Sequence, residues 1–186
     1  MLAVRSTMSF KPELFEDEEG KKLPLANENE LFILQRAKIT FQCKTPDHAL
    51  FKGKGRIYCT TQRIIFVAEK GITQNGCYFE AFEIPLIKMT EEKFNQPIFG
   101  ACSISGLVAA SGDIELGGNF SWKITFANGG TGVVLPVFLR LMEKRKKKEE
   151  IDMTFVQSQK KAFVDPNDPT VIYIAQPIKP AAVQSS

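Results

Sequence analysis

The side chains that could carry catalysis or bind a metal are few and scattered along this chain. His48 is the single histidine among 186 residues, so a zinc site with two or three imidazole ligands cannot form within one chain. Cys43, Cys59, Cys77 and Cys102 show no Cys-x-x-Cys spacing, and scattered cysteines are typical of buried free thiols. A pairing of one cysteine with His48 stays formally open, but no motif marks a nucleophile. We therefore expect no enzyme activity, no cofactor and no bound metal.

Three alternating basic residues, Lys52, Lys54 and Arg56, are the first candidates for an anion-binding site. If they lie on one strand, all three cations project from the same face and could contact one lipid headgroup. The alternative is a solvated strand face, on which basic side chains are common. The acidic pair Glu91–Glu92, by contrast, has no neighbour that would place either residue as a general acid or base.

A second basic group predicts a diffuse patch rather than a convergent site. It consists of Arg140, Lys144, Arg145, Lys146, Lys147 and Lys148. On a helix these charges point in several directions, so they would attract any phosphate-rich or membrane surface or serve in nuclear import. The alternative is a solvated helix end. The net charge of +3 is too small to indicate direct nucleic-acid binding, which we do not expect.

Apolar residues at every second position predict a mainly β core that would position these groups. The clearest strand carries Phe120, Trp122, Ile124 and Phe126 on one face. Further strands are expected over residues 31–43, 54–61, 63–68, 78–86 and 99–110, separated by glycine-rich turns.

The apolar period changes after Gly130 and predicts one helix, from about residues 131–134 to 149. Pro136 is tolerated there because it falls near the first turn. The helix stripe consists of Val134, Val137, Phe138, Leu141 and Met142. Six or seven strands followed by one helix predict an antiparallel β-barrel or sandwich capped by that C-terminal helix, the pattern of a pleckstrin-homology-like domain.

Composition divides the chain into three parts. Residues 1–21 are acidic and predict a mobile arm or a loose extension. Residues 22–149 form the domain with its helix, and residues 150–186 predict an extended tail, with docking of part of it on the domain left open. The longest apolar run, Val133–Leu139, is seven residues long and is too short to span a membrane. No signal peptide is recognisable. We expect a protein of the cytoplasm, the nucleus or both, with peripheral membrane contact as an alternative.

Three segments, in order, carry a resemblance to a known family. Residues 53–66 (GKGRIYCTTQRIIF) resemble the signature of a GRAM domain, which has the pleckstrin-homology fold. Residues 96–101 (QPIFGA) and 122–130 (WKITFANGG) resemble segments of the WW-domain-binding protein 2 family. The resemblance covers about residues 23–142. It implies a GRAM domain in an adaptor protein with roles in transcriptional coactivation.

The tail departs from this family in the feature that serves WW-domain binding. Family members dock WW domains through Pro-Pro-x-Tyr motifs, but this chain has no Pro-Pro dipeptide, and Tyr173 follows Val171 and Ile172. We therefore do not expect WW domains as partners. A weaker resemblance, to an Asn-Pro-x-Asn-Pro segment followed by tyrosine, marks a candidate tail interaction segment at Asp165, Pro166, Asn167, Pro169 and Tyr173.

Taken together, these patterns predict a non-enzymatic GRAM-domain adaptor with a protein partner that the sequence does not identify. The alternative is a peripheral membrane module that binds phosphoinositide or other anionic lipid headgroups through Lys52, Lys54 and Arg56.

Overall fold

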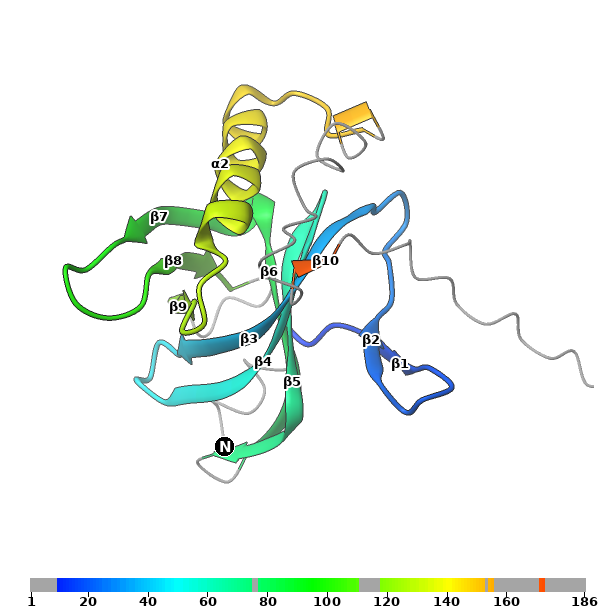
Figure 1. Ribbon diagram of the computed structural model, residues 1–186, viewed down its shortest axis with the longest axis vertical. Helices are drawn as coiled ribbons and strands as arrows, with labels where there is room; N and C mark the ends of the chain where they lie inside the picture. The colour runs from blue at the N-terminus through cyan, green and yellow to red at the C-terminus, as the bar shows by residue number, and fades with distance from the viewer. Residues whose placement is uncertain (1–9, 75–76, 111–117, 153, 156–170, 173–186) are drawn as a thin grey trace, which may run out of the picture.

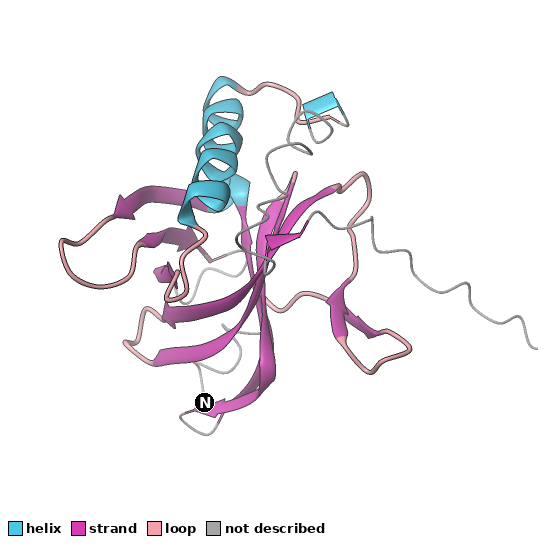
Figure 2. Cartoon of the chain, viewed as in Figure 1, coloured by secondary structure: helices cyan, strands magenta, loops and turns pink. Residues whose placement is uncertain are grey.

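The computed structural model describes residues 10–74, 77–110, 118–152, 154–155 and 171–172, and it is mainly β with one C-terminal helix (Figures 1 and 2). The elements follow in the order β1 (Leu14–Glu16), β2 (Lys22–Pro24), β3 (Phe32–Lys44), β4 (Leu50–Thr60), β5 (Arg63–Gln74), β6 (Cys77–Pro85), η1 (Leu86–Lys88), β7 (Met89–Asn95), β8 (Ser103–Ala109), β9 (Asn119–Thr125), α2 (Thr131–Lys147) and β10 (Val171–Ile172).

Eight of these strands form one antiparallel sheet: seven follow the spatial order β6-β5-β4-β3-β9-β8-β7, and β10 pairs with β3 off this path. Strands β6 and β7 follow each other in the chain, yet they lie at opposite ends of this order and share no ladder in the part of the chain that the structure describes. Pro85 and the 3₁₀ turn of η1 separate them, and proline has no N–H to donate to a ladder. The expected barrel is therefore not closed.

The sheet folds back so that its two halves enclose one hydrophobic core. Phe82 on β6 and Phe120 on β9 come from opposite halves, yet their ring centroids lie 6.5 Å apart. Trp122 is buried in this core, as predicted, and its ring packs edge-on against Phe138 of α2 at 6.4 Å. The core thus lies between the halves of an open, bent sheet, with the helix on one side.

The helix confirms the sequence prediction. It spans Thr131–Lys147, and its buried residues are the five of the predicted stripe. Gly130 precedes it with φ 89°, where a Cβ atom would lie 2.3 Å from Cζ of Arg36. The buried Arg36 on β3 donates hydrogen bonds to the carbonyl oxygens of Asn128 and Gly129, at 3.1 and 2.6 Å. Arg36 therefore fixes the turn from which the helix starts.

The described part of the acidic N-terminal segment packs against the sheet, whereas the sequence predicted a mobile arm or a loose extension over residues 1–21. The ring of Phe10 is fully buried, 5.3 Å from that of Phe82 and 5.0 Å from that of Phe120. The backbone N–H of Glu83 donates to the carbonyl oxygen of Phe10 at 2.7 Å. Strands β1 and β2 follow as a small antiparallel hairpin. The prediction rested on the charges of residues 1–21, and these do not reveal that one aromatic residue, Phe10, is buried in the core.

Two further differences concern the strands near the second half of the sheet. Strand β7 was not predicted, because a single one of its seven residues, Met89, is buried and the sequence shows no alternation there. The strand expected over residues 99–110 begins only at Ser103. Residues 96–102 instead form a loop, with Gly100 at φ +107°.

Two residues of the tail are described, and they extend the sheet. Val171 and Ile172 of β10 pair antiparallel with Arg36 and Gln35 of β3. The candidate tail residues Asp165, Pro166, Asn167, Pro169 and Tyr173 lie outside the described residues. None of the described helices has the length and apolar character needed to cross a membrane.

Candidate functional site

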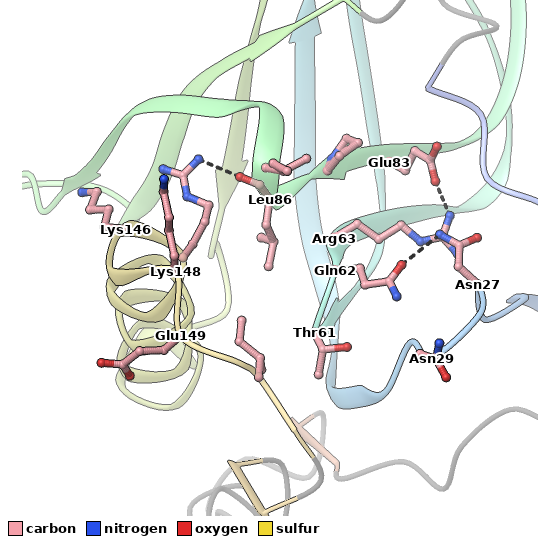
Figure 3. Close-up of a pocket in the computed structure, with 14 residues that line it drawn as sticks. Asn27, Asn29, Thr61, Gln62, Arg63, Glu83, Leu86, Lys146, Lys148 and Glu149 are labelled. Atoms are coloured by element: carbon pink, nitrogen blue, oxygen red, sulfur yellow. Dashed lines mark hydrogen bonds and ion pairs between the residues drawn. The ribbon is translucent and has the colours of Figure 1, made fainter.

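An open groove of about 870 Å³ separates the C-terminal end of α2 from the turn between β4 and β5 (Figure 3). Lys146 and Lys148 lie on the helix side of the groove. Asn27, Asn29 and Gln62 lie on the opposite side. The groove is therefore built from segments that are far apart in the sequence, and its two walls differ in charge.

Arg63, at the start of β5, lies on the side of the groove that carries Asn27, Asn29 and Gln62 and holds that side in place. Its guanidinium binds the buried carboxylate of Glu30 through two hydrogen bonds of 2.9 and 3.0 Å, and it forms an ion pair with Glu83. Its Nη2 also donates to the carbonyl oxygen of Leu25 at 2.7 Å. Burial lowers the pKa of Arg63, but the hydrogen bonds to Glu30 and Glu83 raise it above its usual value. The charged network ties the loop before β3 to β5 and β6.

Arg145 holds the helix wall in a similar way. Its Nη1 donates to the carbonyl oxygens of Leu86, at 2.7 Å, and of Met89. Oε1 of Glu92 lies 3.2 Å from Nη2 of Arg145 and 3.1 Å from Nζ of Lys146, so it forms an ion pair with each. Burial raises the pKa of Glu92, but a backbone hydrogen bond and Lys146 outweigh it, so the pKa lies below its usual value. Glu92 thus has a structural role, which the sequence did not reveal.

The groove combines an apolar side with an exposed cation at its rim. Pro85, Leu86, Ile87 and Ile151 give it an apolar side, and Ile87 is 82% exposed. Lys148 forms no ion pair with any described residue, so its charge is available at the rim. An extended chain could place an apolar side chain on Ile87 and a carboxylate near Lys148.

Lys52, Lys54 and Arg56 occupy alternate positions of β4, as predicted, but they differ in exposure. Lys52 and Lys54 are exposed on β4, as expected. Arg56 is covered by the β1–β2 hairpin, where its Nη2 donates to the carbonyl oxygen of Lys22 at 3.3 Å and its Nε is buried. It lines a separate hollow with Lys21, whose pKa is lowered by burial and by the charge of Arg56. The β1–β2 hairpin, which was not predicted, therefore contacts Arg56 and leaves it less exposed than Lys52 and Lys54.

The predicted basic patch at the helix end is partly neutralised by neighbouring acids. Arg140 and Lys148 are exposed. Four members form ion pairs with neighbouring acids: Lys144–Glu149 at 3.2 Å, Arg145–Glu92 at 3.2 Å, Lys146–Glu92 at 3.1 Å and Lys147–Glu143 at 2.7 Å. The patch therefore presents less free charge than the sequence suggests.

The cysteines of the described core have the character of structural thiols. Cys43 and Cys59 are buried, and burial raises the pKa of each thiol to about 12. His48 lies in the exposed turn between β3 and β4. Among the described residues, no group of three or more His, Cys, Asp or Glu side chains is placed to hold a metal ion.

Sequence reasoning missed most of the groove. Gln62 and Arg63 lie within residues 53–66, the segment that resembles a GRAM signature, so the sequence did mark these two positions. Asn27, Asn29 and Ile87 carried none, because they come from loops and turns that only the fold brings together.

Comparison with known proteins gives relatives for part of the chain. WW domain-binding protein 2 of Mus musculus and that of Homo sapiens are each 33% identical over 105 residues, covering 55% of this chain and 38% of the relative. A UPF0664 stress-induced protein of Schizosaccharomyces pombe is 28% identical over 130 residues, covering 69% of this chain and 72% of that protein. The chain thus spans well under half the length of the WW domain-binding relatives.

Other comparisons add little to this result. No protein-family model matches the chain. A chain of the 8S snRNP assembly intermediate superposes with a TM-score of 0.44 and 8% identity, over 70% of this chain and 92% of that one. This likeness is too distant to carry an argument about fold or function.

Proposed function

We propose that this chain is a non-enzymatic adaptor whose groove between α2 and the β4–β5 turn binds an extended segment of a partner protein. The observation that carries the proposal is the groove itself, which combines an exposed isoleucine, Ile87, with the cation of Lys148 and a facing wall of amide side chains. Amides and exposed apolar groups suit hydrogen bonding and burial of a peptide. The relatives named for WW domain binding support a protein partner in general terms.

The fold assignment belongs to the same proposal. We assign the main sheet and the helix α2 to a GRAM domain of the pleckstrin-homology type, as the resemblance in residues 53–66 implies. The strand order, with β3 next to β9 and the helix packed on the core, supports this assignment. We extend the proposal to an adaptor role in gene regulation, in the cytoplasm or the nucleus. WW domains are not the proposed partner, because the chain has no Pro-Pro dipeptide.

Peptide selection on the whole chain tests the groove. A displayed library of extended peptides is selected against the chain, and the affinity of the recovered peptides is measured by fluorescence anisotropy. We expect peptides that combine an apolar residue with nearby acidic residues. Ile87→Asp and Lys148→Glu should each weaken their binding about tenfold or more, because they remove a contact worth roughly 1.5 kcal/mol.

Lys52→Glu is the matched control, since it changes the charge as Lys148→Glu does but lies far from the groove. It should leave peptide affinity unchanged. If Ile87→Asp and Lys148→Glu bound the selected peptides as well as the parent chain does, the groove would not be the binding site.

A further inference from the structure

The first half of β3 has one edge that the neighbouring strand β9 does not reach. Along its other edge, β3 pairs with β4 from Phe32 to Lys44. On the edge in question it pairs with β9 over residues 40–44. Among the strands that the structure describes, β10 is the one that pairs with this edge before residue 40, through Gln35 and Arg36 (Figure 1).

A bulge and a turn explain why β9 leaves this edge. The pairing of β3 with β4 shifts after Arg36, where Lys38 has φ 56°, and such a bulge bends the strand. Thr40–Thr125 is the last pair between β3 and β9, and the chain then turns toward α2. Strand β10 runs antiparallel to β3, as β9 does. It therefore takes the place along the edge that β9 gives up.

The surroundings of this edge are apolar on both faces of the sheet. Phe32, Ile33 and Leu34 are fully buried. Ile33 and Leu34 belong to the main core, whereas Phe32 belongs to the smaller cluster with Tyr58 on the opposite face. A strand added beside them has apolar neighbours on both faces. A continuous run of β-branched or aromatic residues therefore suits this position better than an alternating pattern.

The tail carries such a run. Residues 170–174 (TVIYI) are all β-branched or aromatic, and Pro169 and Pro177 stand on either side of them. Val171 and Ile172 of this run form the ladder with β3, which has two residue pairs in the part of the tail that the structure describes. Strands usually have about five or six residues, so a longer segment could replace this short ladder.

We propose that this edge of β3 is an acceptor site for an extended, β-branched segment of a partner protein, and that Val171 and Ile172 occupy it in cis until the partner displaces them. Strand addition gives affinity through main-chain hydrogen bonds, and the neighbouring side chains select the residues of the added strand. An open strand edge is a template for pairing with another chain, so the docked tail also protects it. The site is separate from the groove, because none of the described residues that line the groove belongs to β3.

Hydrogen exchange of the whole chain tests the contact in cis. Val171→Gly with Ile172→Gly lowers the β-propensity of the tail segment. The amides of β3 that face β10 should then exchange about tenfold faster or more, because their opening no longer requires loss of the β10 ladder. Amides of residues 40–44, which pair with β9, should not change. The control variant, Ala182→Gly with Val183→Gly, should exchange as the parent chain does.

A labelled synthetic peptide of residues 168–176 tests binding in trans, with fluorescence anisotropy as the measurement. It should bind the Val171→Gly, Ile172→Gly variant about tenfold more tightly than the parent chain, the difference expected if the edge is free in about one parent molecule in ten. Methylation of the peptide at the backbone nitrogens of Val171 and Ile172 should abolish binding, because it removes ladder donors and keeps the side chains. Lys148→Glu, which should weaken binding in the groove, should leave the affinity for this peptide unchanged, so the two sites can fail separately.

Selection of displayed peptides on the same double glycine variant tests the chemistry of the partner. We expect proline-free, β-branched sequences that compete with the labelled peptide. Recovery of sequences without this character would contradict the proposal, as would failure of the labelled peptide to bind the variant, equal binding of its methylated form, or unchanged exchange of β3. Analytical ultracentrifugation covers the remaining occupant. A parent chain that is dimeric, and becomes monomeric in the double glycine variant, would identify the tail of a second copy instead of a partner protein.

Discussion

At the scale of single residues, Arg63 shows how a buried charge is made compatible with the core. Its guanidinium forms ion pairs with Glu30 and Glu83 and also donates a hydrogen bond to the carbonyl oxygen of Leu25. A buried ion pair contributes little net stability, because desolvation offsets the attraction, but removal of one partner leaves the other charge buried without compensation. The network therefore makes the position of the groove wall depend on one side chain.

Arg63→Met should destabilise the protein by about 3–5 kcal/mol, because it leaves the carboxylate of Glu30 buried and unpaired. Urea unfolding followed by circular dichroism measures the loss. The double variant Glu30→Leu with Arg63→Met should lose less than the sum of the two single variants, since no unpaired charge remains between them. Strictly additive losses would show that the two residues do not interact.

At the scale of elements, α2 was the part of the fold that the sequence predicted best. A helix stripe repeats over several turns, so its buried face can be read from period alone. The mostly exposed strand β7 and the single buried residue Phe10 show no such repetition, and both were missed. The environment of the candidate strand residues was harder to predict, because Arg56 differs from Lys52 and Lys54 through its contact with the β1–β2 hairpin.

Phe138→Ala should cost roughly 3–5 kcal/mol of unfolding free energy, because it empties a buried site beside Trp122. Leu139→Ala, one residue further along α2, is the control, since Leu139 is largely exposed and its loss should change stability by less than about 0.5 kcal/mol. Thermal and urea unfolding of the two variants give the comparison. Equal stability of the two would mean that α2 does not cap the core.

At the scale of the whole molecule, ion pairs join parts of the chain that the sheet ladders do not connect. Glu80 on β6 accepts hydrogen bonds from Lys22 of β2 and from Tyr78, and these lower the pKa of Glu80. Glu92 on β7 joins the helix end to the sheet, and its pKa is lowered too. Both contacts hold an outer element, the hairpin or the helix, against the sheet.

The lowered pKa values predict acid sensitivity. A carboxylate with a lower pKa in the folded state stabilises the fold above its ordinary pKa of 4.5, and this stabilisation is lost as the pH falls below that value. Unfolding free energy measured between neutral pH and pH values below 4.5 should therefore drop more steeply for the parent chain than for Glu80→Gln with Glu92→Gln. Parallel pH profiles of the two proteins would contradict this assignment.

The position of Phe10 in the core also has a consequence for the order in which the protein can mature during synthesis. During synthesis Phe10 leaves the ribosome well before its two aromatic partners, Phe82 and Phe120, which lie much later in the chain. Domains fold as units while translation proceeds at about 5–20 residues per second. Phe10 therefore lacks its final packing partners for several seconds during synthesis. During that time a chaperone could bind the N-terminal segment and shield this side chain.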